Sequence, residues 1–170
     1  MIIQCDTREH KKEWERIRSQ FDSIGVDYIR SKLWVGDYMN LDNPRVVIDR
    51  KKDLLELCGN VTQQHERFQA ELVRAQQKNI KIIILCEHGE GIESLSDVYF
   101  WHNPRLDMYE WVIQDGHPVK APKFPRATEG ASLYRSLITM RDKYGVSFAF
   151  CNQSETGCVI AQLLGGCDGG

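Results

Sequence analysis

The chain has 170 residues, of which 42% are hydrophobic, 9% aromatic and 27% charged. This length and apolar fraction suit one compact domain and exclude a disordered chain. No apolar run approaches the ~20 residues of a membrane-spanning helix. The net charge of −2 gives no global basicity that would indicate nucleic-acid binding. The six cysteines form no CxxC pair, and the N-terminus resembles no signal peptide, so we expect reduced thiols in a cytoplasmic protein.

The first 90 residues alternate between predicted strands and predicted helices. Apolar residues at helical spacing, from Trp14 to Ile24, predict a helix that ends at Gly25. A second helical pattern runs from Asp53 to about Lys78, with a break or kink near Gly59-Asn60. The predicted strands are residues 2–5, 26–35, 46–51 and 80–86, and the last has the continuous apolar character of a central strand. These elements indicate an α/β fold with a small mixed central sheet flanked by helices.

The second half is predicted to complete the same domain after an irregular insertion. Residues 91–128 are rich in aromatic residues, and we assign them only a helix near 93–100. Thr128 is positioned to cap a helix that runs to about Tyr144, and a strand at 146–150 and a helix from Ser154 follow. We therefore predict a single domain over residues 1–165, divided into a core (1–90), the insertion (91–128) and a helix-strand-helix segment (129–165). Residues 166–170 are predicted to be a flexible tail.

Acidic residues stand where several predicted strands end. They are Asp6 and Glu9, Asp37, and Asp49 in Asp49-Arg50-Lys51. Residues two apart on a strand point to the same face, so Asp49 and Lys51 share a side. Two carboxylates can hold a hard divalent cation, which polarises a phosphate oxygen and acidifies a bound water. A neighbouring lysine can orient that water or stabilise developing negative charge.

The alternative interpretation is that these are ordinary solvent-exposed residues of a sheet, with no functional role. A tripeptide of the form DxK occurs by chance in most chains, and Gly36-Asp37 alone is more often a turn than a metal ligand. The combination carries more weight, because buried strands normally avoid charge and acids at their ends indicate a site.

Four ordered motifs resemble the nuclease domain of the XPF family of structure-specific DNA endonucleases. They are DTRE at 6–9, VGDY at 35–38, VIDRK at 47–51 and the helical segment around Arg67-Phe68. The family signature has Gly-Asp, then a strand with Glu-Arg-Lys, then three residues and an Asp. This family is a branch of the PD-(D/E)xK, restriction-endonuclease-like superfamily, so the resemblance implies that fold and a divalent-metal-dependent DNA endonuclease.

The resemblance also implies roles for single residues. Asp37 and Asp49 would be metal ligands, and Arg50 would contribute its backbone carbonyl or a phosphate contact. Lys51 would be the catalytic lysine. The same resemblance implies that Asp6 or Glu9 completes or supports the catalytic site, and that Arg8 and Arg67 contact phosphates or support the site residues. With Arg50, these are the expected DNA contacts, and Lys52 is a further candidate because it lies near the site, although a lysine alone is more often a solvated surface residue. The metal would be Mg²⁺ or Mn²⁺.

Two departures from the family pattern bear on activity. Asp49 stands where the family has Glu, which shortens the side chain that would reach the metal. The final Asp of the signature is displaced, because position 55 is Leu and Asp53 is among the nearest acids. Asp53 is either a site residue in a shorter loop or the N-cap of the following helix.

The implied function is hydrolysis of phosphodiester bonds, with branched or flap DNA implied by the family alone. The alternative is a catalytically inactive DNA-binding or dimerisation subunit of the same fold. Nothing after residue 90 resembles the family's tandem helix-hairpin-helix module, so we expect DNA binding through the nuclease surface, a homodimer or a heteromeric partner chain. Phe100-Trp101 and Tyr109 with Trp111 either stack on unpaired bases or pack onto the domain. We expect no membrane association, and a bacterial, archaeal or phage origin.

Overall fold

A six-stranded mixed sheet lies at the centre of the protein. The computed structural model describes residues 1–165. The strand order is β2-β1-β3-β4-β5-β8. Parallel pairs join β1 to β2, β4 to β5 and β5 to β8, and antiparallel pairs join β1 to β3 and β3 to β4. The strands are β1 (Ile2–Cys5), β2 (Asp27–Arg30), β3 (Tyr38–Asn40), β4 (Asn43–Lys51), β5 (Lys81–Cys86) and β8 (Ser147–Phe150).

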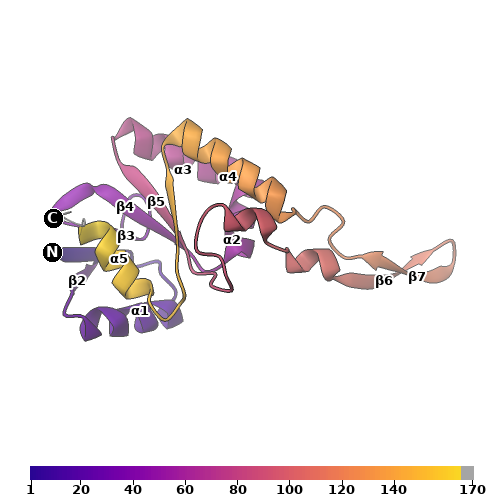
Figure 1. The fold of residues 1–170 in the computed structure, drawn as a ribbon, viewed down its shortest axis with the longest axis horizontal. Helices are drawn as coiled ribbons and strands as arrows, with labels where there is room; N and C mark the ends of the chain where they lie inside the picture. Colours follow the sequence, from indigo (N-terminus) through magenta and orange to yellow (C-terminus); the bar gives the residue numbers. More distant parts are fainter. Residues whose placement is uncertain (166–170) are drawn as a thin grey trace.

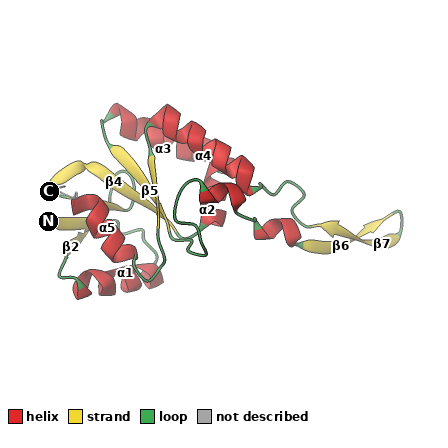
Figure 2. Ribbon diagram, in the orientation of Figure 1, coloured by secondary structure: helices red, strands yellow, loops and turns green. Residues whose placement is uncertain are grey.

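Helices cover both faces of the sheet (Figures 1 and 2). On one face, α2 (Leu54–Thr62), α3 (His65–Gln77) and α4 (Gly130–Tyr144) pack on alternate residues of β4 and β5, among them Val47 and Ile84. On the other face, α1 (Lys11–Ser23) and α5 (Thr156–Gly165) pack on Ile48 and Leu85. The apolar runs of β4 and β5 are therefore continuous because both sides of these strands are buried. This arrangement confirms the predicted mixed α/β fold.

Most of the predicted elements have counterparts in the structure, with shifted ends. The strand predicted for 26–35 ends at Arg30, and the helical pattern of 53–78 is divided at Gln63-Gln64 into α2 and α3. The turn between β3 and β4 lies at Leu41-Asp42, two residues before Pro44. Helix α4 has Glu129 as its N-cap residue, without a side-chain cap, so the prediction that Thr128 caps it was wrong.

The insertion contains more regular structure than its sequence pattern predicts. The helix predicted near 93–100 is only a 3-10 turn, η1 (Asp97–Phe100), followed by a second, η2 (Pro104–Asp107). An antiparallel hairpin then forms from β6 (Tyr109–Gln114) and β7 (His117–Pro122), and it extends away from the sheet (Figure 1). Asp115-Gly116 at its tip have positive φ, the geometry of a tight hairpin turn.

Across residues 1–165, no helix is long and apolar enough to cross a bilayer. Five cysteines (5, 58, 86, 151 and 158) are free thiols, and the sixth, Cys167, lies with the predicted tail outside the described residues.

Candidate metal site and DNA cleft

Gly36 places Asp37 directly before β3, beside β4. Gly36 has a φ of +66°, and a Cβ there would lie 2.3 Å from Val47 Cγ1 and 2.9 Å from the Ile48 carbonyl oxygen. Only glycine fits this left-handed, crowded position. The Asp37 N–H then donates to the Ile48 carbonyl at 2.8 Å, and the Asp37 carbonyl accepts from the Asp6 N–H at 2.8 Å. Gly36 and Asp37 together therefore fix the position of a carboxylate beside β4.

Asp49 and Lys51 lie on the same face of β4 as Asp37. The Lys51 ammonium donates to Asp49 Oδ1 at 2.8 Å, and the backbone N–H of Arg50 donates to Asp37 Oδ2 at 2.8 Å. Lys51 Nζ also lies 5.4 Å from the centre of the Phe68 ring on α3. Among residues 1–165, the second oxygen of each carboxylate accepts no hydrogen bond. Each carboxylate is thus held by one oxygen and leaves the other available.

The charges of these three groups are strongly coupled. Burial raises the pKa of Asp37 well above its usual value, and the nearby Asp49 carboxylate raises it further, while Lys51 partly offsets both. Burial alone would lower the pKa of Lys51, but the Asp49 and Asp37 carboxylates outweigh it and keep that pKa raised. Lys51 is therefore a cation at neutral pH. Among residues 1–165, Lys51 is the only cationic side chain that hydrogen bonds to either carboxylate, so a further positive charge between them would relieve their repulsion.

The donor set fits a hard divalent cation, although it is small. The described residues contain no group of three or more Asp, Glu, His or Cys side chains arranged to hold a metal. Asp37 and Asp49 supply two carboxylate oxygens, and a backbone carbonyl with water can complete an all-oxygen set of the kind Mg²⁺ takes. Mg²⁺ commonly binds through one or two carboxylates and keeps several waters, so two carboxylates suffice.

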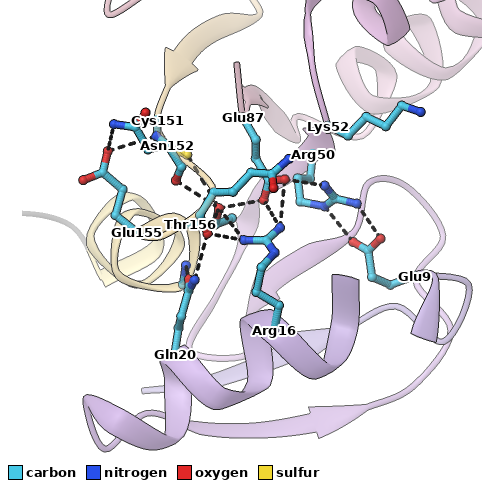
Figure 3. A network of polar contacts seen from close by, with 12 residues as sticks. Glu9, Arg16, Gln20, Arg50, Lys52, Glu87, Cys151, Asn152, Glu155 and Thr156 are labelled. Carbon is cyan, nitrogen blue, oxygen red and sulfur yellow. Dashed lines mark hydrogen bonds and ion pairs between the residues drawn. The ribbon is translucent and has the colours of Figure 1, made fainter. Parts of the chain in front are cut away.

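Arg50 points to the opposite face of β4, into a buried network (Figure 3). Its guanidinium donates to Glu9 at 2.7 and 3.0 Å and to Glu87 at 2.8 Å. Glu87 also accepts from Arg16 at 2.7 and 2.9 Å and from the Thr156 hydroxyl at 2.6 Å. The Arg50 side chain is 6% exposed. Its guanidinium is therefore bound by two carboxylates, and the expectation that Arg50 contacts DNA stays a prediction.

Glu9 borders the cleft but is committed to this network. Its two oxygens accept from Arg50, and Oε2 also accepts from the Tyr38 hydroxyl at 2.9 Å. Burial alone would raise the pKa of Glu9, but the hydrogen bonds and charge of Arg50, with the Tyr38 bond, hold it below its usual value. Glu9 is a buried anion that positions Arg50.

Asp6 is fully buried and saturated with donors. It accepts from the backbone N–H of Arg8 at 2.6 Å and of Leu33 at 2.7 Å, and from the Arg8 guanidinium at 2.8 and 2.9 Å. Asp6 thus fixes the loops after β1 and β2, and no oxygen is left for a metal. Among residues 1–165, neither the Asp6 nor the Glu9 side chain hydrogen bonds to Asp37, Asp49 or Lys51, and Asp6 contacts Asp37 through the backbone alone.

An open cleft of about 1020 Å³ contains the Asp37, Asp49 and Lys51 group. The four expected DNA contacts, Arg8, Arg50, Lys52 and Arg67, all line it, although the Arg50 guanidinium is bound by Glu9 and Glu87. The Arg8 side chain is 57% exposed even though Asp6 binds it. Asn60 also lines the cleft, and its buried Oδ1 has no hydrogen-bond partner among residues 1–165. The cleft therefore joins a paired-carboxylate centre to a rim of cations.

Asp53 acts as the N-cap of α2. Its side chain accepts from the Glu56 N–H at 2.7 Å, and its backbone is extended. The structure therefore shows the capping role directly. Asp53 also lines the cleft.

The sequence analysis missed Glu87 and its partners Arg16 and Thr156. Glu87 follows the buried strand β5 directly, the same placement that singled out Asp37 and Asp49, so the signal was present. The partners carry no such signal, because Arg16 and Thr156 lie on helices 140 residues apart that meet only in the folded chain.

The chain belongs to the ERCC4 domain family, whose model matches residues 5–163. Two solved structures are similar in fold. XPF from Aeropyrum pernix aligns with a TM-score of 0.62 and 18% identity, over 96% of this chain and 63% of that chain.

The same Aeropyrum pernix protein in complex with DNA aligns with a TM-score of 0.60 and 19% identity, over 96% of this chain and 62% of that one. This chain thus spans less than two thirds of the length of either structure. No curated protein matches it. The match of the ERCC4 family model confirms the predicted XPF-type family, and these proteins are nucleases as a class.

Proposed function

We propose that this protein is a divalent-metal-dependent DNA endonuclease that hydrolyses phosphodiester bonds. The observation that carries the proposal is the convergence of Asp37, Asp49 and Lys51 on one face of β4, inside a cleft lined by arginine and lysine. Membership of the ERCC4 domain family supports the reaction class.

Asp37, Asp49 and the backbone carbonyl of Arg50 would hold the Mg²⁺ or Mn²⁺ ion. When bound, such an ion supplies polarisation of a phosphate oxygen and a more acidic water. Lys51 is charged and anchored 2.8 Å from Asp49, so it can stabilise negative charge on the phosphate in the transition state, and a cation cannot act as the general base. Gly36 and the Arg50 N–H fix Asp37 before substrate arrives.

Arg8, Lys52 and Arg67 would contact phosphates along the cleft. Such contacts position a DNA strand without reading its sequence, and they weaken steeply as salt rises. That an Aeropyrum pernix XPF with this fold is found in complex with DNA supports this ligand. We propose branched or flap DNA as the substrate, bound by a homodimer or together with a heteromeric partner chain.

A second candidate function is a catalytically inactive subunit of the same fold that binds DNA or a partner. Its specific support is that Asp53, one of the acids nearest to the last position of the family signature, is used as a helix cap. Retention of Asp37, Asp49 and Lys51 in one cleft, with Lys51 bound to Asp49 at 2.8 Å, favours the active enzyme.

Cleavage of labelled flap, splayed-arm, four-way and linear duplexes at low salt tests the proposal. Reactions contain Mg²⁺, Mn²⁺ or EDTA, and compare wild type with Asp49→Asn and Lys51→Ala. We expect metal-dependent cutting that falls at least about 100-fold in both variants. Asp27→Asn and Lys81→Ala, which remove exposed charges on β2 and β5, are matched controls that should cut like wild type. Binding without cutting in every metal would overturn the catalytic proposal and leave the inactive subunit.

A further inference from the structure

A second pocket lies between the cleft and the base of hairpin β6–β7. It has a volume of about 230 Å³, and Gln63 and Arg105 line both it and the cleft. Three cationic residues line this pocket, Arg105, Lys123 and Arg126, and none of the acidic residues within 1–165 does. Since the chain as a whole carries a net charge of −2, a pocket with only cations is a local departure that fits an anionic ligand.

An aromatic ring stands among these cations. The guanidinium carbon of Arg105 lies 5.2 Å from the centre of the Phe124 ring, and Lys123 Nζ lies 5.8 Å from it. Phe124 is only half-buried and lines the pocket. Both cations lie over the ring, and an aromatic ring combined with arginine and lysine is the chemistry by which sites for unpaired strands stack bases and hold phosphates.

The polypeptide around the pocket is held by hydrogen bonds. Asn103, 1% exposed, accepts from the Arg105 N–H at 3.0 Å and donates to the Thr128 carbonyl at 2.9 Å, which joins the two ends of the insertion. The Lys123 N–H donates to the Met108 carbonyl at 2.8 Å. The backbone that carries Arg105 and Lys123 is therefore fixed before any ligand binds.

The hairpin continues the same chemistry beyond the pocket. Tyr109, Trp111 and Ile113 lie two residues apart on β6, so they share one face, and they are 51%, 74% and 73% exposed. Lys120 is the cross-strand neighbour of Trp111, and its Nζ lies 4.8 Å from the centre of the Tyr109 ring. Single surface aromatics are ordinary, but a row of them next to lysine is a stacking platform.

We propose that this pocket and the adjoining hairpin face bind an unpaired DNA strand. One base stacks on Phe124, its flanking phosphates lie on Arg105, Lys123 and Arg126, and neighbouring bases lie on Tyr109 and Trp111. A single-stranded ligand is favoured over a duplex because a ring can stack on a base face only where that base is unpaired. The inference rests on the proposed function and deepens it, since it makes a single-stranded arm beside the cleft the feature that selects the substrate.

The test is binding of a fluorescein-labelled oligothymidylate, measured by anisotropy in EDTA so that no cleavage is needed. A second probe of equal length carries abasic sites in place of the central bases. We expect wild type to bind the probe with bases more tightly. Phe124→Leu keeps an apolar side chain for packing but removes the ring, and it should weaken binding of that probe about tenfold, with little change for the abasic probe.

The phosphate contacts have a separate readout. In Lys123→Gln/Arg126→Gln, the slope of log K against log salt should fall by about 1.4, since each phosphate contact with a single strand contributes about 0.7. Lys143→Gln is the matched control. Lys143 is exposed and lies over the Tyr144 ring, but at the far end of α4 from the hairpin (Figure 1). The Lys143→Gln variant should leave the preference for the probe with bases over the abasic probe unchanged.

The outcomes separate this inference from the nuclease proposal. If wild type cuts DNA but Phe124→Leu retains the preference for bases, the inference is overturned and the nuclease stands. Equal losses for both probes in Phe124→Leu would also overturn it, because they would show that no base is stacked. If the base preference depends on Phe124 while no metal supports cutting, the inference stands and the catalytic proposal fails. Circular dichroism of each variant excludes misfolding as the cause of a loss.

Discussion

The two faces of strand β4 carry charge in opposite ways. On one face, Arg50 is enclosed by Glu9 and Glu87, and Arg16 and Thr156 complete the partners of Glu87 (Figure 3). On the other face, two carboxylates, Asp37 and Asp49, share one ammonium group within an open cleft. Three consecutive residues of one strand therefore belong to two different environments. We call the side of Arg50, Glu9 and Glu87 the closed face, and the side of Asp37, Asp49 and Lys51 the open face.

The difference shows which charges hold the fold and which are available for chemistry. Where every buried charge has partners, as around Arg50, burial is compatible with ionisation and the pKa of Glu9 stays low. Where anions outnumber cations, as around Asp37, burial and the neighbouring anion raise its pKa. A metal or a phosphate finds unmet interactions only on the second face.

Removal of one charge from the closed face should give the largest loss of stability. Glu87→Gln leaves Arg16 without its carboxylate partner and Arg50 with only Glu9, so we expect unfolding to cost about 3 kcal/mol less, as for other buried ion pairs that lose one member. Urea unfolding at pH 7 measures this. Glu15→Gln is the control, because the exposed Lys11–Glu15 pair should contribute less than about 0.5 kcal/mol. Equal effects of the two variants would contradict the comparison.

Acid should weaken the closed face in a way that depends on Glu9. Because the folded-state pKa of Glu9 is lowered, its contribution is complete above its usual pKa of 4.5 and is lost as the pH falls below that value. We expect the free energy of unfolding of wild type to fall more steeply between pH 5 and 3 than that of Glu9→Gln. The difference between the two should be smaller than the loss of stability in Glu87→Gln. Parallel pH profiles would show that Glu9 is not ionised in the way described.

On the open face, removal of a charge should raise the stability of the fold, not lower it. Asp37→Asn keeps an oxygen to accept from the Arg50 N–H and removes a buried anion beside Asp49, so stability at pH 7 in EDTA should rise by on the order of 1 kcal/mol. A raised folded-state pKa means that the cost of ionised Asp37 appears as the pH rises above 3.8, so the gain should shrink toward pH 4. Chemical unfolding across this range measures both. A loss of stability in Asp37→Asn would show that its charge is paired after all.

The comparison also explains what the sequence could and could not predict. Asp37, Asp49 and Lys51 were found because period-two alternation places residues 49 and 51 on one face, and that rule is local. The same rule places Arg50 on the other face, but its partners come from α1, β5 and α5, whose meeting is a matter of tertiary structure. Hairpin β6–β7 was missed because its faces are both largely exposed, so no alternation of apolar and polar residues marks it.

Substitution of Asp53 tests whether the residues of the open face that take part in chemistry continue beyond β4 into α2. As the N-cap of α2, it should contribute about 1 kcal/mol, which Asp53→Ala loses and Asp53→Ser retains, because a serine hydroxyl also accepts from the N–H of the third helical residue. Serine is a poor ligand for a hard cation in place of carboxylate. If Asp53 only caps the helix, Asp53→Ser should therefore cut DNA within about twofold of wild type, and Asp53→Ala should differ from it in stability alone. A large loss of cutting in Asp53→Ser with unchanged stability would instead place Asp53 in the chemistry, as the last acid of the family signature. The closed face would then still end at Arg50, while the open face would reach from the end of β4 into the first turn of α2.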